Sequence, residues 1–213
     1  GLNKVIPAMS EKAGIKADKF LKDFDVEVIT GKLVDSFDAT KVTLKDGTEI
    51  KAGTLIWGAG VKGNPVKGLE EAVVKGRMKV NEFNALKDYP DIFAIGDLAA
   101  MQSEKFPKGH PMLAPVAIQQ GKRLAKNLMR MHRGKSMKSF HFINKGVMAT
   151  VGRNRAVADV KNTTIGGFLA WFAWMFIHLF YLIGFRRRMI VFTNWVYNYF
   201  TYDRNTRLIL KIK

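Results

Sequence analysis

The most constraining feature of this chain is a long apolar stretch near its C-terminal end. Residues 165–185 read IGGFLAWFAWMFIHLFYLIGF, and His178 is their only ionisable side chain. By length alone this stretch suffices to span a bilayer, for which about 20 apolar residues are needed. A second uncharged stretch of 14 residues, 189–202, is too short to span one as a helix. The two stretches predict contact with lipid and leave open whether residues 165–185 span the bilayer or lie on it.

Two groups of side chains favour a position at the membrane surface. Trp and Tyr prefer the headgroup boundary to the hydrocarbon centre, and both stretches are rich in them: Trp171, Trp174, Tyr181, Trp195, Tyr197, Tyr199 and Tyr202. Arg186, Arg187 and Arg188 separate the stretches and would meet anionic headgroups. We therefore expect Trp171, Trp174 and Trp195 to anchor the chain and the three arginines to attract it to anionic lipid. A helix buried in a globular core is the alternative.

The formal net charge is +17, and nearly all of it lies in the second half of the chain. Residues 120–213 hold 18 Lys and Arg against two acids and carry +16, so the first 119 residues carry the remaining +1. Such a basic half indicates an anionic partner. A nucleic-acid platform also interleaves basic and aromatic residues, but it needs no uncharged stretch of this length. We therefore expect a membrane surface as partner and no nucleic acid.

The absence of cysteine excludes several chemistries from this chain. Without a thiol it has no disulfide framework, no thiolate zinc or iron–sulfur site and no cysteine nucleophile. The four histidines show no ligand spacing, so we expect no metal site. The chain opens GLNK without an apolar signal segment. A basic chain that is not exported would meet the anionic leaflet at the cytoplasmic face of the inner membrane, as a peripheral or monotopic protein.

Local signals predict an alternation of helices, strands and hairpins that is typical of α/β nucleotide-binding folds. Apolar spacing and the possible N-cap Ser10 predict a helix over 9–24, and an Asp-Gly turn predicts a hairpin over 41–50. The remaining predicted elements are strands at 26–29, 54–57, 78–80 and 92–95 and a hairpin-like segment over 140–160, and the strand at 54–57 is expected to be buried.

A longer helix is predicted over 115–132. Its apolar spacing places four side chains on the inner face, with Lys and Arg on the outer one. The predicted inner residues are Ala117, Leu124, Leu128 and Met131.

A glycine-rich segment directly after a predicted strand invites a misinterpretation. Residues 58–63, GAGVKG, match the G-x-G-x-x-G fingerprint of dinucleotide-binding loops. That fingerprint also needs a helix opening at its third glycine, whereas Asn64, Pro65 and Gly68 break any helix there. We interpret these glycines instead as the exit of a strand from a nucleotide domain, where the backbone passes close to a bound ring.

Several segments together resemble the second half of the type II NADH dehydrogenases, the single-subunit, FAD-containing NADH:quinone oxidoreductases that pump no protons. Besides the aromatic tail they are TLIWGAG at 54–60, DIFAIGDL at 91–98, APVAIQQG at 114–121 and FINKGVMA at 142–149. The resemblance implies an α/β fold: the C-terminal part of a flavoprotein with two dinucleotide-binding domains and a membrane-anchoring helical tail. It also implies that a hydride passes from NADH to FAD and that two electrons then pass to a membrane quinone.

The same resemblance implies a division of the chain. Residues 1–62 would be the remainder of the NADH-binding domain, 63–150 the C-terminal part of the FAD-binding domain with the quinone-site helix, and 151–213 the membrane anchor. Members of the family are longer and begin with a Rossmann half that carries the true FAD fingerprint. The chain is therefore expected to be a fragment that is inactive alone.

The expected flavin contacts lie at three places. Asp97 follows a predicted strand through Gly96, so its carboxylate would emerge where open α/β sheets bind ligands, and the resemblance assigns it to the ribityl hydroxyls of FAD. Lys145 is the one cation in an apolar hairpin, and the resemblance places it beside the flavin, where a cation stabilises the reduced form. Ala59 and Gly60 are candidates for the approach of the nicotinamide. The alternatives are that Asp97 caps the next turn and that Lys145 is solvated.

The expected quinone contacts lie at the start of the helix over 115–132. The family motif Ala-Gln-x-Ala-x-Gln matches Ala114, Ala117 and Gln119, whereas Pro115 replaces its first glutamine. Small alanines would let a flat quinone head approach the flavin, with Ala117 also beside the cofactor, and Gln119 would bond a quinone carbonyl. Gln120 is expected to be the solvated neighbour, or either glutamine is surface.

The sequence leaves other functions open. A sulfide:quinone oxidoreductase shares the architecture, although this chain lacks the cysteines that handle sulfide. A non-catalytic basic domain that binds a membrane or nucleic acid is the alternative from another class. The quinone type, the preference for NADH over NADPH and the formation of a homodimer are not decided by the sequence.

Overall fold

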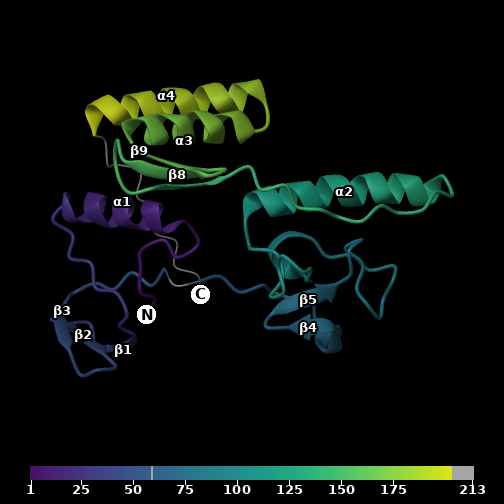
Figure 1. The fold of residues 1–213 in the computed structure, drawn as a ribbon, viewed down its shortest axis with the longest axis horizontal. Coiled ribbons are helices and arrows are strands. Elements are labelled where there is room, and N and C mark those ends of the chain that lie inside the picture. The colour runs from purple at the N-terminus through teal and green to yellow at the C-terminus, as the bar shows by residue number, and fades with distance from the viewer. Residues whose placement is uncertain (59, 203–213) are drawn as a thin grey trace. The chain divides into compact units, whose positions relative to one another are not determined.

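The computed structural model describes residues 1–58 and 60–202 and divides the chain into two compact units. Unit one combines residues 1–55 with the chain from 145 onward, and unit two comprises 56–144. Figure 1 gives the elements of both units, which are α/β in each case and are taken separately below. The α/β class expected from the sequence is therefore confirmed.

The N-terminal part of unit one contains a helix and a small antiparallel sheet. The helix, α1 (Glu11–Lys22), begins at Ser10, whose hydroxyl accepts a hydrogen bond from Ala13 N (3.2 Å) as an N-cap should. The sheet has the order β1-β2-β3, with β1 (Val34–Phe37), β2 (Lys41–Leu44) and β3 (Glu49–Lys51). The predicted helix and the predicted Asp-Gly hairpin are both confirmed.

The rest of unit one is built in layers around a second antiparallel sheet. Its strands are β7 (Val147–Thr150), β8 (Ala156–Val160) and β9 (Thr163–Gly167), so the hairpin expected within 140–160 is confirmed. Side chains alternate along β8: Val157 packs with Ala13 and Ala17 of α1, whereas Ala156 and Ala158 pack with Ala170 on the other face. The sheet thus lies between α1 and the C-terminal helices, as Figure 1 shows.

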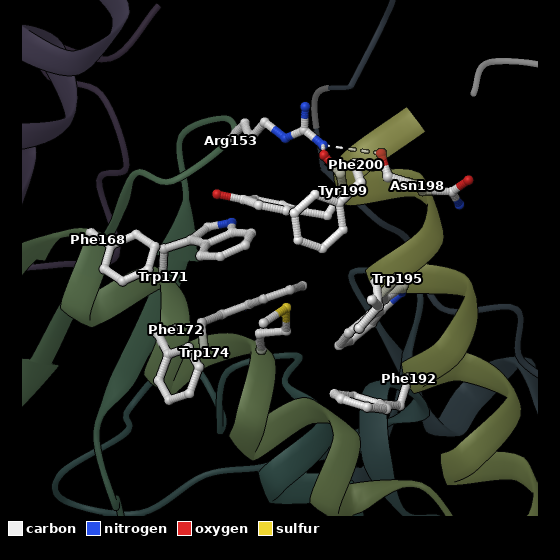
Figure 2. A pocket seen from close by; sticks show the side chains of 12 residues that line it. Arg153, Phe168, Trp171, Phe172, Trp174, Phe192, Trp195, Asn198, Tyr199 and Phe200 are labelled. Atoms are coloured by element: carbon white, nitrogen blue, oxygen red, sulfur yellow. Dashed lines mark hydrogen bonds between the residues drawn. The ribbon is translucent and has the colours of Figure 1, made fainter. Parts of the chain in front are cut away.

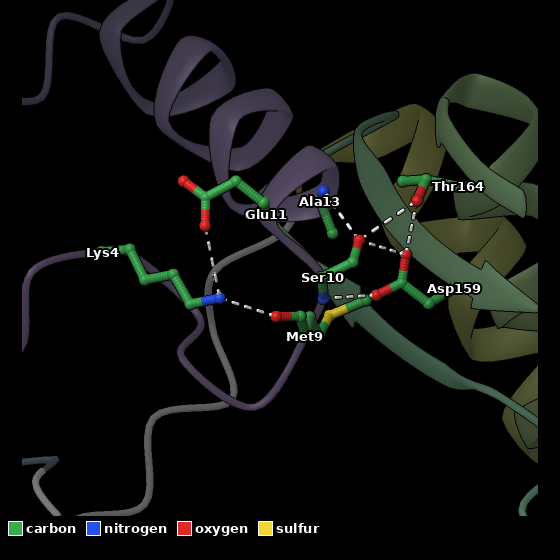
Figure 3. Close-up of polar contacts among 7 residues, drawn as sticks. All are labelled: Lys4, Met9, Ser10, Glu11, Ala13, Asp159 and Thr164. Carbon is green, nitrogen blue, oxygen red and sulfur yellow. Dashed lines mark hydrogen bonds and ion pairs between the residues drawn. The ribbon is translucent and has the colours of Figure 1, made fainter. Parts of the chain in front are cut away.

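A carboxylate ties the start of α1 to this sheet. Asp159 of β8 accepts hydrogen bonds from the amide and the hydroxyl of Ser10 (2.7 and 2.8 Å) and from the hydroxyl of Thr164 (2.7 Å) (Figure 3). Partial burial alone would raise the pKa of Asp159, but these hydrogen bonds lower it below its usual value. The N-cap of α1 is therefore held in place by a residue far away in the sequence.

The apolar stretch 165–185 does not form one helix. Its first three residues complete β9, and α3 (Phe168–Tyr181) covers the next 14. Leu182 is extended and Gly184 has φ 87°, a left-handed conformation that glycine adopts readily, so the chain turns there into α4 (Phe185–Thr201). Phe185 therefore belongs to α4. Among the described residues, no helix is long and apolar enough to cross a membrane.

Unit two is formed by short strands and one long helix. Its sheet has the order β4-β5-β6, with β4 (Val73–Val74) antiparallel and β6 (Ala99–Met101) parallel to β5 (Arg77–Val80). The 3-10 turns η1 (Glu70–Ala72) and η2 (Gly96–Leu98) precede β4 and β6, and α2 (Ala114–His132) follows. The predicted strand at 78–80 and the helix over 115–132 are confirmed. The core of unit two comprises Ala72, Met78, Val80, Leu86, Ala94, Ala99, Met101 and Phe140.

Three predicted strands are absent from the described structure. Residues 26–29 and 54–57 lie outside any ladder, and 92–95 contribute only an isolated bridge between Phe93 and Ala85. The expected burial of 54–57 is also wrong, because Ile56 and Trp57 are 89% and 65% exposed. A strand needs a neighbour to bond with, and no described residue offers one to this segment.

Candidate functional site

The site begins at the tight turn of η2, where the backbone lies against α2. Gly96 has φ +66°, and a Cβ built on it would lie 3.1 Å from the Cβ of Ala117. The amide of Gly96 donates a 2.7 Å hydrogen bond to Oε1 of Gln120 on the same helix. The structure therefore brings together Gly96, Asp97 and Ala117, three of the residues that the resemblance assigns to the flavin.

A buried arginine also forms hydrogen bonds with this turn. Arg77, at the start of β5, is 8% exposed, and its Nε donates to the carbonyl oxygen of Asp97 (3.1 Å). Its Nη2 donates to the carbonyls of His110 (3.0 Å) and Ala99. Burial lowers the pKa of Arg77, and the nearby charge of Asp97 partly opposes this shift. The sequence analysis missed Arg77, because a charged residue in a short strand gives no sign of burial.

The Asp97 side chain itself stays available. It is exposed, and within residues 1–58 and 60–202 its carboxylate accepts no hydrogen bond. The alternative that Asp97 caps the following turn lacks support, since η2 has no side-chain cap and the cap amide of Ala99 donates to the carbonyl of Gly96. The Asp97 carboxylate is therefore an acceptor-only group on a turn that Gln120 and Arg77 hold in place.

Gln119 and Gln120 have opposite environments on α2. The half-buried Gln119 forms two hydrogen bonds with Ile143: its Nε2 donates to the carbonyl and its Oε1 accepts from the amide, both at 3.0 Å. Gln120 is 0% exposed, so its expected solvation was wrong. In the part of the chain that the structure describes, Nε2 of Gln120 has no partner. Gln119 therefore fixes the neighbouring segment, and Gln120 fixes the Gly96 turn.

The buried face of α2 is more polar than predicted. Its buried residues are Val116, Gln120 and Asn127. Asn127 exchanges hydrogen bonds with the backbone of Lys138 (2.9 Å each), which explains why an amide is tolerated there. Leu128 and Met131, predicted to face inward, are exposed. Ala114 is exposed in the first turn of α2, one helical turn before Ala117.

The remaining predicted contacts belong to other segments of the chain. Lys145 is exposed, two residues before β7, and belongs to unit one. Gly60 is exposed with φ +78° and open space around it. Ala59 lies outside the described residues. No cluster of metal-ligating side chains occurs among the residues that the structure describes.

The three predicted membrane tryptophans line an aromatic pocket of about 450 Å³ between α3 and α4 (Figure 2). Trp171, Trp174 and Trp195 line it and are half-buried, so they face the pocket instead of projecting freely outward. Arg186 and Arg187 are exposed in the first turn of α4, and Nε of Arg188 donates to the carbonyl of Leu182 (2.8 Å).

Two protein families match this chain. Residues 1–121, more than half of it, match the family model of pyridine nucleotide-disulphide oxidoreductases. Residues 144–203 match the model of the NDH2 C-terminal domain. The two matches leave only a short interval and the last residues uncovered.

A curated relative supports the same relationship. The chain is 34% identical over 206 residues to the type II NADH:quinone oxidoreductase NdhA of Mycobacterium tuberculosis. The match covers 90% of this chain and 43% of the relative, so the chain spans less than half of that protein's length.

Solved structures share the fold at low sequence identity. NDH2 from Plasmodium falciparum in complex with NADH superposes with a TM-score of 0.82 at 16% identity, over 94% of this chain and 57% of that one. The sulfide:quinone oxidoreductase of Aquifex aeolicus gives a TM-score of 0.63 at 16% identity, over 91% and 50%.

Proposed function

Because the chain belongs to the pyridine nucleotide-disulphide oxidoreductase family, and within it to the type II NADH:quinone oxidoreductases, we propose that it is part of a flavoprotein that oxidises NADH and reduces a membrane quinone. FAD, when bound, supplies the two-electron redox chemistry that links these substrates. The chain's own residues bind and orient the reactants. The chain itself supplies no thiol for the disulphide chemistry in the family's name, because it contains no cysteine.

The observation that carries this proposal is the turn at Gly96 and Asp97. Three of its features suit FAD: the backbone approaches Ala117 closely, the Asp97 carboxylate is exposed, and the first turn of α2 contains no acid. The open positive end of α2 favours electronegative ligand atoms. We assign Asp97 to accept hydrogen bonds from ribityl hydroxyls, with Gly96 and Ala117 providing the close approach.

The quinone side of the proposal rests on the start of α2. Ala114 and Ala117 leave room for a flat ring, since they are small residues one turn apart. Gln119 is the candidate donor to a quinone carbonyl: Nε2 carries two hydrogens, and the hydrogen bond to Ile143 uses one of them. Pro115 cannot supply the contact of the glutamine that it replaces.

Three assignments rest on the family relationship alone. Lys145 would place a cation beside the flavin, and Ala59 and Gly60 would lie along the approach of the nicotinamide. The division into 1–62, 63–150 and 151–213 stays part of the proposal.

Membrane association completes the proposed function. The exposed aromatic side chains of α3 and α4 and the arginines at the start of α4 support binding to an anionic lipid surface. We propose a peripheral or monotopic position on the cytoplasmic face. A homodimer is compatible with this position, and the molecular mass in solution would test for it.

The test uses the gene product that contains this chain. NADH should bleach the visible absorbance of its bound flavin under anaerobic conditions, and a water-soluble quinone should restore it. Sulfide in place of NADH should leave the absorbance unchanged. Bleaching by sulfide alone would favour the sulfide:quinone alternative, and a colourless product would favour the non-catalytic binding domain.

A further inference from the structure

The aromatic pocket between α3 and α4 is open although its walls are apolar. Trp174 stacks on Trp195 with centroids 6.2 Å apart, and Trp171 lies 5.6 Å from Tyr199, so the two helices meet through rings. Figure 2 shows these rings around a hollow. Its volume of about 450 Å³ falls in the range of small-molecule sites. An apolar hollow of this size suits an apolar ligand better than water.

A fixed cation stands at the rim of this pocket. Nη2 of Arg153, in the turn between β7 and β8, donates to the carbonyls of Asn198 (3.0 Å) and Tyr199 (2.5 Å) near the end of α4. Its guanidinium also lies over the rings of Tyr199 (4.6 Å) and Tyr202 (3.8 Å). No carboxylate among the described residues pairs with it. Arg153 is therefore held in place by the backbone and rings, and its charge stays uncompensated by any described acid.

The charged side chains in the described part of the chain that builds the pocket are mostly positive. The described residues 145–202 contain seven Lys and Arg and a single acid, Asp159. Asp159 is engaged by Ser10 and Thr164. An apolar ligand with an anionic group therefore complements this pocket better than a neutral one does.

We propose that the pocket binds one acyl chain of an anionic phospholipid, whose phosphate pairs with Arg153. The volume accommodates a chain but not a whole lipid, so the headgroup stays at the rim beside the guanidinium. A guanidinium binds phosphate oxygens through several donors at once. This site deepens the proposed membrane association and rests on it for the source of the ligand. It predicts a saturable stoichiometry of one lipid per chain, which a diffuse basic surface would not give.

The test measures binding of a monomeric short-chain lipid to the full 213-residue chain. Dioctanoyl phosphatidylglycerol should bind saturably by calorimetry and change the fluorescence of the pocket tryptophans. The zwitterionic phosphatidylcholine with the same chains should bind at least about tenfold more weakly, in line with the loss of one charge-assisted contact. Each methylene removed from the chains should weaken binding by up to about fourfold.

Three variants separate the pocket from general attraction. Arg153→Gln should weaken phosphatidylglycerol binding about tenfold and remove the preference over phosphatidylcholine. Lys12→Gln removes the same charge from an exposed position in α1, outside the pocket lining, and should bind as the unmodified chain does. Val196→Trp, which fills the pocket from an exposed position, should weaken both lipids.

Equal losses in Arg153→Gln and Lys12→Gln would overturn the site and leave only diffuse attraction. Equal binding of both lipids, or unchanged binding by Val196→Trp, would overturn it too. The assay needs neither FAD nor quinone. Failure of NADH-dependent bleaching with intact lipid binding would therefore reject the proposed enzyme and keep the lipid site.

Discussion

At the scale of single residues, the candidate site depends on buried polar groups whose hydrogen bonds are long-range. Arg77 and Gln120 approach the turn at Gly96 from a strand and a helix that lie 20 or more residues away in the sequence. Sequence patterns assign Lys, Arg and Gln to the surface by default. They could therefore indicate Asp97 and Gln119 as candidates, but not the buried Arg77 and Gln120 that form hydrogen bonds with the turn. Burial of such groups is decided by tertiary packing and not by local spacing.

The first prediction concerns Arg77. Arg77→Met should lower the free energy of unfolding by about 2–3 kcal/mol, because three backbone carbonyls lose a charged donor and two of these hydrogen bonds are buried. Lys79→Met on the exposed face of the same strand is the matched control and should change it by less than about 0.5 kcal/mol. Urea unfolding of the chain measures both. Equal effects of the two substitutions would show that the turn does not depend on Arg77.

The second prediction concerns His110, which is 4% exposed and surrounded by the rings of Phe106, Phe140 and Phe142. Burial, and secondly the charge of Arg77, lower its pKa below the ordinary value of 6.5. At a pH between the folded-state and the unfolded-state pKa of His110, only the unfolded chain binds the proton. The free energy of unfolding should therefore fall as the pH drops below 6.5, and it should level off below the folded-state pKa.

Thermal unfolding across this pH range tests the prediction with two matched variants. His110→Gln should remove this part of the pH dependence, whereas His141→Gln, at an exposed position, should keep it. A pH dependence that survives in His110→Gln would assign it to other groups.

The third prediction concerns Gln119 in the intact enzyme. Gln119→Ala should raise the apparent KM for quinone and leave the rate of flavin reduction by NADH nearly unchanged, because only the quinone would touch this side chain. Gln102→Ala, an exposed glutamine outside α2, should change neither quantity. If flavin reduction slowed by the same factor as quinone reduction, Gln119 would act on the NADH side or through the fold.

At the scale of elements, the predictions that succeeded rest on local chemistry. The N-cap of α1, the Asp-Gly turn between β2 and β3 and the proline near the start of α2 each act within a few residues. The strands predicted at 26–29, 54–57 and 92–95 failed because pairing depends on a partner elsewhere in space. The apolar stretch 165–185 was taken as continuous although Gly167 and Gly184, both with φ 87°, mark where it divides.

The fourth prediction concerns α4, whose first turn carries three arginines and no acid. Positive charge opposes the dipole at a helix N-terminus, so the double change Arg186→Glu and Arg187→Glu should stabilise α4 by about 0.3–1 kcal/mol per residue. The same change should weaken binding to anionic liposomes by about 1 kcal/mol or more per residue at low salt.

Sedimentation with liposomes at low and high salt measures the predicted loss of binding. The matched control, Lys122→Glu with Lys126→Glu, changes the charge equally on the middle of α2 and should leave liposome binding much less affected. High salt alone should not release the unmodified chain, because burial of aromatic side chains adds to the screened charges. Complete release at high salt would reject the aromatic contribution.

At the scale of the whole molecule, the comparisons confirm the family relationship that the sequence indicated. The motifs at 91–98 and 114–121 meet in unit two, and Lys145 belongs to unit one. The exposed Ile56 and Trp57 stand where a buried strand was expected. The family relationship rests on segments far apart in the chain, and this explains why it could be inferred before any contact was known.

The most direct test of the central claim, that the turn at Gly96 and Asp97 holds FAD, is the flavin content of Asp97→Ala in the intact gene product. The control is Asp91→Ala, an exposed acid shortly before the same turn. We predict that Asp97→Ala purifies folded with little or no FAD, while Asp91→Ala and the unmodified protein carry their full complement. A full complement of FAD in Asp97→Ala would contradict the account.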